Sequence, residues 1–201
     1  MVIDFHTHRD VPKGVFSPRS FGVHPWQAGQ QEVPEAEDAR WHEVLMVGEC
    51  GLDAVRGPSM EVQTACFEQQ LDVAERLGKP VVVHCVRAFD RLMALRRRFG
   101  GTPWVVHGFV GHAQQAHQLV KMGIWPSIGA ALLDPRRGKV ADTVGWLGPD
   151  RLLLETDDSG ADIHDVYEAA CRLLDVSMDE LERSVETHLK AHVLLSQHPI
   201  P

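Results

Sequence analysis

The stretch PVVVHC, residues 80–85, is an apolar run without polar alternation that begins at a proline. Such a run is typical of a strand buried on both faces, as in a parallel sheet. Residues 59–78 before it predict a helix, because Ser59 can cap the N-terminus, apolar residues recur at helical spacing and Gly78 can end it. A helix followed by a buried strand is the repeating unit of an α/β fold.

The same alternation continues on both sides of this unit. Further strands are expected at residues 2–8, 20–25, 44–53, 104–109, 124–133 and 151–157, and further helices at 33–42, 88–99, 112–122, 162–175 and 178–195. The pattern predicts a parallel α/β fold, either a barrel or a doubly wound sheet, in one domain over residues 1–201. Glycine-rich phosphate-binding motifs are absent from the sequence, so a nucleotide cofactor loses its main support.

Composition argues against several classes of protein. With 44% hydrophobic and 24% charged residues the sequence is that of an ordinary globular protein, and no apolar run approaches the ~18 residues of a membrane span. The N-terminus shows no signal-peptide pattern and the four cysteines form no Cys-x-x-Cys pair, so we expect reduced thiols and a cytoplasmic location. The net charge of -8 argues against broad electrostatic binding of nucleic acid, but it allows a nucleic-acid substrate held mainly by metal ions.

Titratable side chains stand at the carboxyl ends of nearly all the expected strands. They are His6, His8, His24, Glu49, His84, His107 and Asp157. In a parallel barrel, catalytic groups gather at this end of the strands. Each residue alone could be a hydrogen-bonded core histidine, an ion-pair partner or a helix cap, but such groups are costly at the ends of core strands unless something pairs them. Their convergence therefore predicts a metal site.

The number of candidate ligands indicates the kind of site. Without His24, whose role stays open, four imidazoles and two carboxylates exceed the about three protein ligands that a catalytic zinc takes. They suit two divalent ions about 3.5–4 Å apart with a bridging carboxylate, for which Glu49 is the natural candidate. Gly48 and Gly51 flank Glu49, and we expect them to let the backbone approach ions or substrate closely.

Six motifs carry a resemblance to a known family. They are FHTH (5–8), GVHPW (22–26), GECGLD (48–53), FEQQLDVAERLGKPVVVHC (67–85), HGFVG (107–111) and LLLETD (152–157). In this order and at roughly this spacing they resemble the TatD family of metal-dependent hydrolases, which are deoxyribonuclease-like barrels of the amidohydrolase type. The resemblance spans about residues 2 to 160. It implies a distorted TIM barrel with two divalent ions, which could be Zn, Mn, Mg or Ni.

The resemblance also implies roles for individual residues. His6, His8 and Asp157 would hold the first ion, Glu49 would bridge, and His84 and His107 would hold the second. Asp157 would orient the attacking water and take its proton, so that Asp157 and Glu49 are the expected catalytic residues.

Three further residues have open roles. His24 could hydrogen-bond the leaving oxygen or the phosphate, or it could only shape the wall of the site. Arg87 could contact a phosphate, or it could be a surface residue that begins a helix. Asp53 could fix the tautomer of a ligand histidine, or it could be a turn residue.

The sequence departs from the family pattern at three places. Residues 9–23, between His8 and His24, leave no room for the β/α unit that the family usually has there, so we predict about seven strands with one β/α unit missing near the N-terminus. After His84 the chain reads Cys-Val-Arg, where the family often has Ser-Arg, and the loop after Asp157 is short. We expect these changes to affect the size of the substrate more than the metal chemistry.

The expected function is hydrolysis of a phosphodiester, in a DNA end or a small molecule, with no obligate protein partner and no membrane partner. An alternative is hydrolysis of an amide, ester or lactone, for which related barrels often use a carbamylated lysine at a strand end. None of the five lysines falls at such a position. A third reading is a non-catalytic metal-binding relative, which the complete ligand set disfavours.

Overall fold

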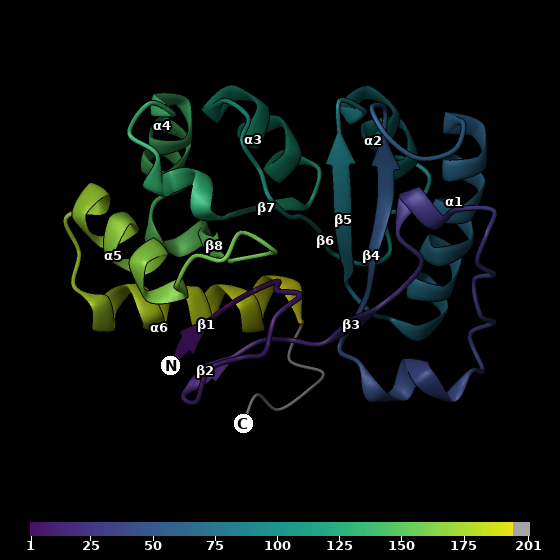
Figure 1. The fold of residues 1–201 in the computed structure, drawn as a ribbon, viewed down its shortest axis with the longest axis horizontal. Helices are drawn as coiled ribbons and strands as arrows, with labels where there is room; N and C mark the ends of the chain where they lie inside the picture. Colours follow the sequence, from purple (N-terminus) through teal and green to yellow (C-terminus); the bar gives the residue numbers. More distant parts are fainter. Residues whose placement is uncertain (195–201) are drawn as a thin grey trace. The chain divides into compact units, whose positions relative to one another are not determined.

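The computed structural model describes residues 1–194 in two compact units (Figure 1). The central unit is Arg19–Val106, and the terminal unit joins Met1–Pro18 to the described residues from His107 onward. The last residue of the helix expected at 178–195 lies outside the described residues, as does His198, which the sequence predicts to be a surface or packing residue. That residues 1–201 form a single domain stays a prediction.

Four parallel strands form the sheet of the central unit. In order across the sheet they are β3 (Ser20–Phe21), β4 (Met46–Asp53), β5 (Val81–Val86) and β6 (Trp104–Val106). The helical elements are the 3-10 turns η1 (Pro25–Gln27) and η2 (Ala39–Glu43) and the helices α1 (Met60–Leu77) and α2 (Phe89–Arg96).

Helix α1 begins and ends where its sequence predicts. The Ser59 hydroxyl accepts a hydrogen bond from the Val62 amide, and Gly78 ends the helix in the left-handed region with φ of 63°. Phe67 and Leu71 lie on the buried face, which packs against β4. This packing holds β4, and with it Glu49, in place.

Two glycines of β4 allow that strand to approach β5 closely. A Cβ atom on Gly51 would lie 2.1 Å from the carbonyl oxygen of His84, and one on Gly48 would lie 2.4 Å from that of Val82. Both glycines also have positive φ, 141° and 134°. The close approach seen in the structure is toward the neighbouring strand. An approach toward ions or substrate stays a prediction.

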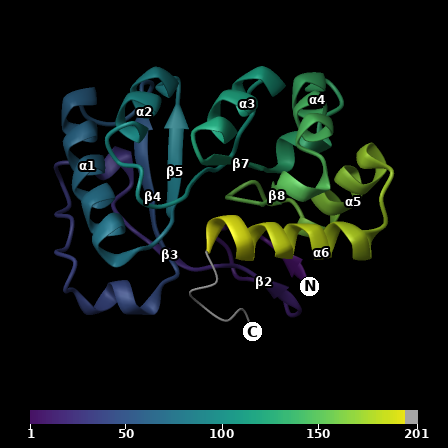
Figure 2. The ribbon, with the colours of Figure 1, turned by 180° about the vertical axis from the view of Figure 1, so that it is seen from behind.

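The terminal unit contains two pairs of parallel strands and a layer of helices. β1 (Val2–Ile3) pairs with β2 (Val15–Phe16), and β7 (Ile124–Ile128) pairs with β8 (Leu153–Leu154). The helical elements are α3 (Ala113–Lys121), η3 (Ala130–Leu133), α4 (Gly138–Leu147), η4 (Pro149–Arg151), α5 (Ile163–Leu174), α6 (Met178–His188) and the π-helical η5 (Leu189–Val193). Helix α6 packs against both β1 and β8, and Figure 2 shows it from behind.

The structure confirms the parallel α/β class but corrects details of the N-terminal region. The described residues contain eight strands rather than about seven, because Val15–Phe16 forms β2 within residues 9–23, which we expected to be loop. What this region lacks is helix, since no helical element is described between β1 and β3. The short connection leaves room for a two-residue strand but not for a helix that returns along it.

Other corrections concern elements with weak local signals. Residues 33–42 form no α-helix and contain only the short 3-10 turn η2, except for its last residue. The run at 124–133 is a strand up to Ile128 and then forms η3, and the run at 151–157 is a strand only at β8. Helix α4 was not expected, because its sequence has Gly138 and Gly145 and its first residue is preceded by Arg137, which makes no side-chain cap. In the structure, the buried Val140 and Val144 secure it by packing.

The structure also bears on the cysteines and on the expected lack of a membrane span. All four cysteines are free thiols. In the described part of the chain, none of the helices is long and apolar enough to cross a membrane.

Candidate metal centre

Backbone hydrogen bonds bring the N-terminal histidines beside Asp157 in the terminal unit. The Phe5 amide donates to the Leu154 carbonyl, and the Asp157 amide donates to the His6 carbonyl at 2.9 Å. The segment after β1 thus runs parallel to the segment after β8. This register places His6 and His8 next to a carboxylate that lies about 150 residues away in sequence.

The three side chains form a group that could hold a cation. The Nε2 atoms of His6 and His8 lie 3.8 and 3.5 Å from Oδ1 of Asp157. One ligating atom from each residue lies within 4.8 Å of the others. The His6 side chain is buried and that of His8 is 52% exposed, so the group is open to solvent on one side.

A second group forms in the central unit around Glu49. Its Oε1 atom lies 2.7 Å from Nδ1 of His84 and 3.2 Å from Nε2 of His24. The other nitrogen of His24, Nδ1, accepts a hydrogen bond from the Trp26 amide at 3.2 Å, which fixes the direction of the ring. His24 was expected at most to contact substrate, but the structure groups it with Glu49 and His84 as a candidate ligand.

Asp53, whose expected role was either to fix a histidine tautomer or to be a turn residue, lies beside the His84 ring. Its Oδ2 atom is 3.2 Å from Nε2 of His84 and accepts a hydrogen bond from the Trp26 indole at 2.7 Å. The amides of Val55 and Arg56 donate to Oδ1. Burial alone would raise the pKa of Asp53, but the hydrogen bonds from Trp26, Val55 and His84 hold it below its ordinary value. The carboxylate is therefore charged and can accept a hydrogen bond from the ring N–H.

His107 has a carboxylate neighbour that the sequence analysis missed. Its Nδ1 atom lies 3.6 Å from Oε1 of Glu155, which has no exposed surface. Burial alone would raise the pKa of Glu155, but His107, His6 and Ser127 hold it below its ordinary value. Glu155 stands two residues before Asp157 in LLLETD, and this strand-like spacing was the signal that could have identified it. In the same unit, the ring centroids of His107 and His6 are 4.7 Å apart.

Backbone strain is concentrated at two of the candidate residues. Arg87 and Asp157 have φ of 51° and 50°, and the third non-glycine residue with positive φ in the described chain, Asp175, is the C-cap of α5. A left-handed conformation costs a non-glycine residue of order 1 kcal/mol and is often retained where a side chain must be aimed. Arg87 is exposed directly after β5, and Asp157 lies three residues after the end of β8.

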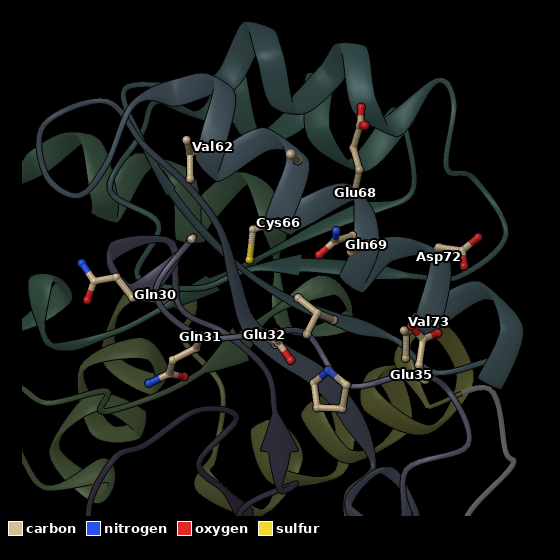
Figure 3. Close-up of a pocket in the computed structure, with 14 residues that line it drawn as sticks. Gln30, Gln31, Glu32, Glu35, Val62, Cys66, Glu68, Gln69, Asp72 and Val73 are labelled. Atoms are coloured by element: carbon tan, nitrogen blue, oxygen red, sulfur yellow. The ribbon is translucent and has the colours of Figure 1, made fainter.

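The donor sets of both groups fit a divalent cation. Each group offers two imidazoles and one carboxylate, which are the ligands that Zn, Mn and Ni accept readily. A large hollow in the central unit has a different character (Figure 3). It has a volume of about 960 Å³ between α1 and residues 29–35, and Glu32, Glu35, Glu68 and Asp72 line it. None of the predicted site residues lines it, and its charge would repel a polyanion.

A parallel α/β chain with histidine and carboxylate groups at its strand ends has the architecture of the metal-dependent hydrolase barrels. The model of the TatD related DNase family matches residues 10–191. The chain therefore belongs to the TatD-related DNase family. His6 and His8 precede the matched range, so their assignment depends on the geometry described above.

Individual relatives agree with this assignment. The chain is 35% identical over 146 residues to the uncharacterized metal-dependent hydrolase YjjV of Escherichia coli, covering 69% of this chain and 56% of that protein. It is 37% identical over 149 residues to the 3'-5' ssDNA/RNA exonuclease TatD of Edwardsiella piscicida, covering 68% of this chain and 55% of that protein. The chain thus spans about half the length of the curated relatives that it matches.

Solved structures support the fold. The crystal structure of the E. coli TatD homologue YJJV has a TM-score of 0.75 at 26% identity, covering 90% of this chain and 78% of that one. A TatD family hydrolase from Entamoeba histolytica has a TM-score of 0.71 at 18% identity, covering 89% of this chain and 74% of that one. These similarities place the chain in the α/β, TIM-type barrel class.

Proposed function

We propose that this chain is a divalent-metal-dependent phosphodiesterase of the deoxyribonuclease type, which acts on DNA ends or on small phosphodiesters. The observation that carries the proposal is that each unit holds two imidazoles and a carboxylate with ligating atoms within 4.8 Å. The name of the Edwardsiella relative, a 3'-5' ssDNA/RNA exonuclease, supports a single-stranded nucleic-acid end as the substrate.

The proposed ligands follow the two groups. His6, His8 and Asp157 would hold one ion, and Glu49 and His84, together with His24, would hold another. His107 is proposed as a further ligand. That Glu49 bridges the two ions, and that His84 and His107 share one of them, stays a prediction because these residues belong to different units.

When bound, the ions would supply Lewis-acid polarisation of the phosphoryl oxygen and would lower the pKa of a water molecule. The protein residues have separate tasks. Asp157, which is 38% exposed at its side chain, accepts the proton of the attacking water. The exposed Arg87 guanidinium binds a phosphate oxygen of the substrate. Asp53 holds the ring of His84 in position from behind.

The proposal is tested on metal-stripped protein that is refilled with Mg, Mn, Zn or Ni in turn. Cleavage of a short end-labelled single-stranded DNA and of a chromogenic phosphodiester is followed in the wild type, in Glu49→Gln and in Asp157→Asn. We expect metal-dependent turnover that both variants reduce by about 10²–10⁴-fold. Glu43→Gln, an exposed carboxylate in η2, is the control and should keep full activity.

The substrates separate the possible outcomes. Turnover of the chromogenic diester but not of DNA would restrict the function to small phosphodiesters. A protein that binds divalent ions but cleaves neither substrate would contradict the proposal, and amides, esters and lactones would then be tested.

A further inference from the structure

We propose that Glu155 is a positioning residue that holds His107 as the tautomer with its proton on Nδ1, so that Nε2 is the nitrogen that ligates a metal ion. The inference rests on the proposed function only in taking His107 as a ligand. It concerns a residue that the sequence analysis did not single out.

The position of the Glu155 carboxylate is fixed on both oxygens. Oε1 accepts a hydrogen bond from the Gly108 amide and Oε2 accepts one from the Ser127 hydroxyl, both at 2.6 Å. The residue has no exposed surface, so its charge meets these two hydrogen bonds and the neighbouring imidazoles of His107 and His6 rather than water. A carboxylate without water needs such donors, because a buried charge that has no partners strongly destabilises the fold.

The same oxygen that binds Gly108 also faces His107. The distance from Oε1 to Nδ1 of the ring is 3.6 Å, and the His107 side chain is 6% exposed. A charged carboxylate can only accept hydrogen bonds, so the N–H of the ring is favoured on the side that faces it, which is Nδ1. Without such a partner, a neutral imidazole populates both tautomers. Only the tautomer protonated on Nδ1 leaves the lone pair of Nε2 free to bind a cation.

The backbone joins Glu155 to the candidate centre of its own unit. Glu155 precedes Asp157 by two residues, and the peptide segment that carries both is anchored where the Asp157 amide donates to the His6 carbonyl. Asp53 and His84 repeat the arrangement in the central unit, with a carboxylate against one ring nitrogen and Glu49 against the other. Partners of this kind orient ligating histidines and raise their basicity.

The tautomer is measured directly by ¹⁵N nuclear magnetic resonance on the full metal-free chain labelled in its histidines, with the His107 signal assigned from a His107→Asn variant. We expect the wild-type ring to be protonated on Nδ1. Glu155→Gln, which keeps an acceptor oxygen, should retain this tautomer, whereas Glu155→Met should shift the population toward Nε2 protonation. A wild-type ring protonated on Nε2 would overturn the proposal, and this result does not depend on whether the Glu155 variants fold.

A zinc titration of the same proteins by calorimetry gives the second readout. We expect Glu155→Met to weaken the affinity of one site by about 10–100-fold, and Glu155→Gln to restore most of it. Thr143→Val removes an equally buried hydroxyl from α4 and is the matched control, which should bind zinc as the wild type does. Unchanged affinity in Glu155→Met would count against the proposal.

The two proposals fail differently. A wild-type protein with the expected tautomer and zinc affinities but no cleavage of any phosphodiester would overturn the proposed function and support the role of Glu155. A protein that cleaves DNA with a His107 ring protonated on Nε2 would do the reverse.

Discussion

The Oδ2 atom of Asp53 lies 3.2 Å from Nε2 of His84, while Nδ1 of the same ring lies 2.7 Å from Glu49. The ring is thus held between two carboxylates. Only Glu49 belongs to a candidate ligand group, and Asp53 is tied to the surrounding backbone by the amides of Val55 and Arg56. The arrangement separates a residue that would bind the ion from one that would orient the ligand.

Replacement of Asp53 by Asn should therefore weaken metal binding in the central unit without unfolding it. We expect the affinity to fall by about 10–100-fold, because the amide is neutral and accepts a weaker hydrogen bond from His84. Calorimetric titration of the metal-free protein measures the change. Asp90→Asn, an exposed carboxylate on α2, is the control, and an equal loss in both variants would contradict the prediction.

Removal of metal ions should lower the thermal stability of the protein, since ions that bind only the folded chain stabilise it by mass action. A free ion concentration of 100 times Kd stabilises the fold by about 2.7 kcal/mol for each site. Thermal unfolding with chelator and with added Mn or Zn measures the effect. His8→Gln should reduce the gain from the added ion, and an equal gain in this variant would show that His8 is not a ligand.

Replacement of Gly51 by Ala should destabilise the fold. The new Cβ atom would lie 2.1 Å from the carbonyl oxygen of His84, and the residue has φ of 141°. We expect the free energy of unfolding to fall by more than about 1 kcal/mol, measured by urea denaturation. Gly145→Ala in α4 is the opposite control, because nothing lies within 4 Å of its Cβ position and the helix should gain roughly 0.5–1 kcal/mol.

The free energy of unfolding should decrease as the pH is lowered below about 6.5. The cause is His188, a buried residue at the end of α6. Its ring packs 4.5 Å from that of Trp125, and neither of its nitrogens has a hydrogen-bond partner among the described residues. Burial, together with the charges of His192 and Arg151, lowers the pKa of His188 to about 4.

The sign follows from the two states. The unfolded chain binds a proton on this residue near pH 6.5, whereas the folded chain binds it only near pH 4, so acid favours unfolding. The protein has its full stability with respect to His188 above pH 6.5. It loses in total about 3 kcal/mol of unfolding free energy as the pH falls from 6.5 to about 4. Urea denaturation at several pH values from 7 to 4 gives the free energy of unfolding as a function of pH. This free energy should change less with pH in His188→Phe, while the exposed His42→Gln should show the wild-type dependence.

Local patterns in the sequence predicted the elements that have complete start and stop signals. Helix α1 has a serine cap, a periodic apolar face and a terminal glycine, and its bounds agree with the prediction to within one residue at each end. Helix α4 has none of these signals at its start, and contacts of Val140 and Val144 with the rest of its unit stabilise it instead. The two-residue strand β2 likewise depends on pairing with β1, which no local window contains.

By itself the sequence determined the parallel α/β class, the family and a set of candidate metal-binding residues, because buried strand runs, motif order and residue chemistry can be read along the chain. The tertiary structure decided which of these residues meet. It brought His24 to Glu49, revealed Glu155 beside His107, and turned Gly48 and Gly51 toward the neighbouring strand. Such contacts depend on strand register and on the direction of each side chain, which are fixed only when segments distant in sequence pack together.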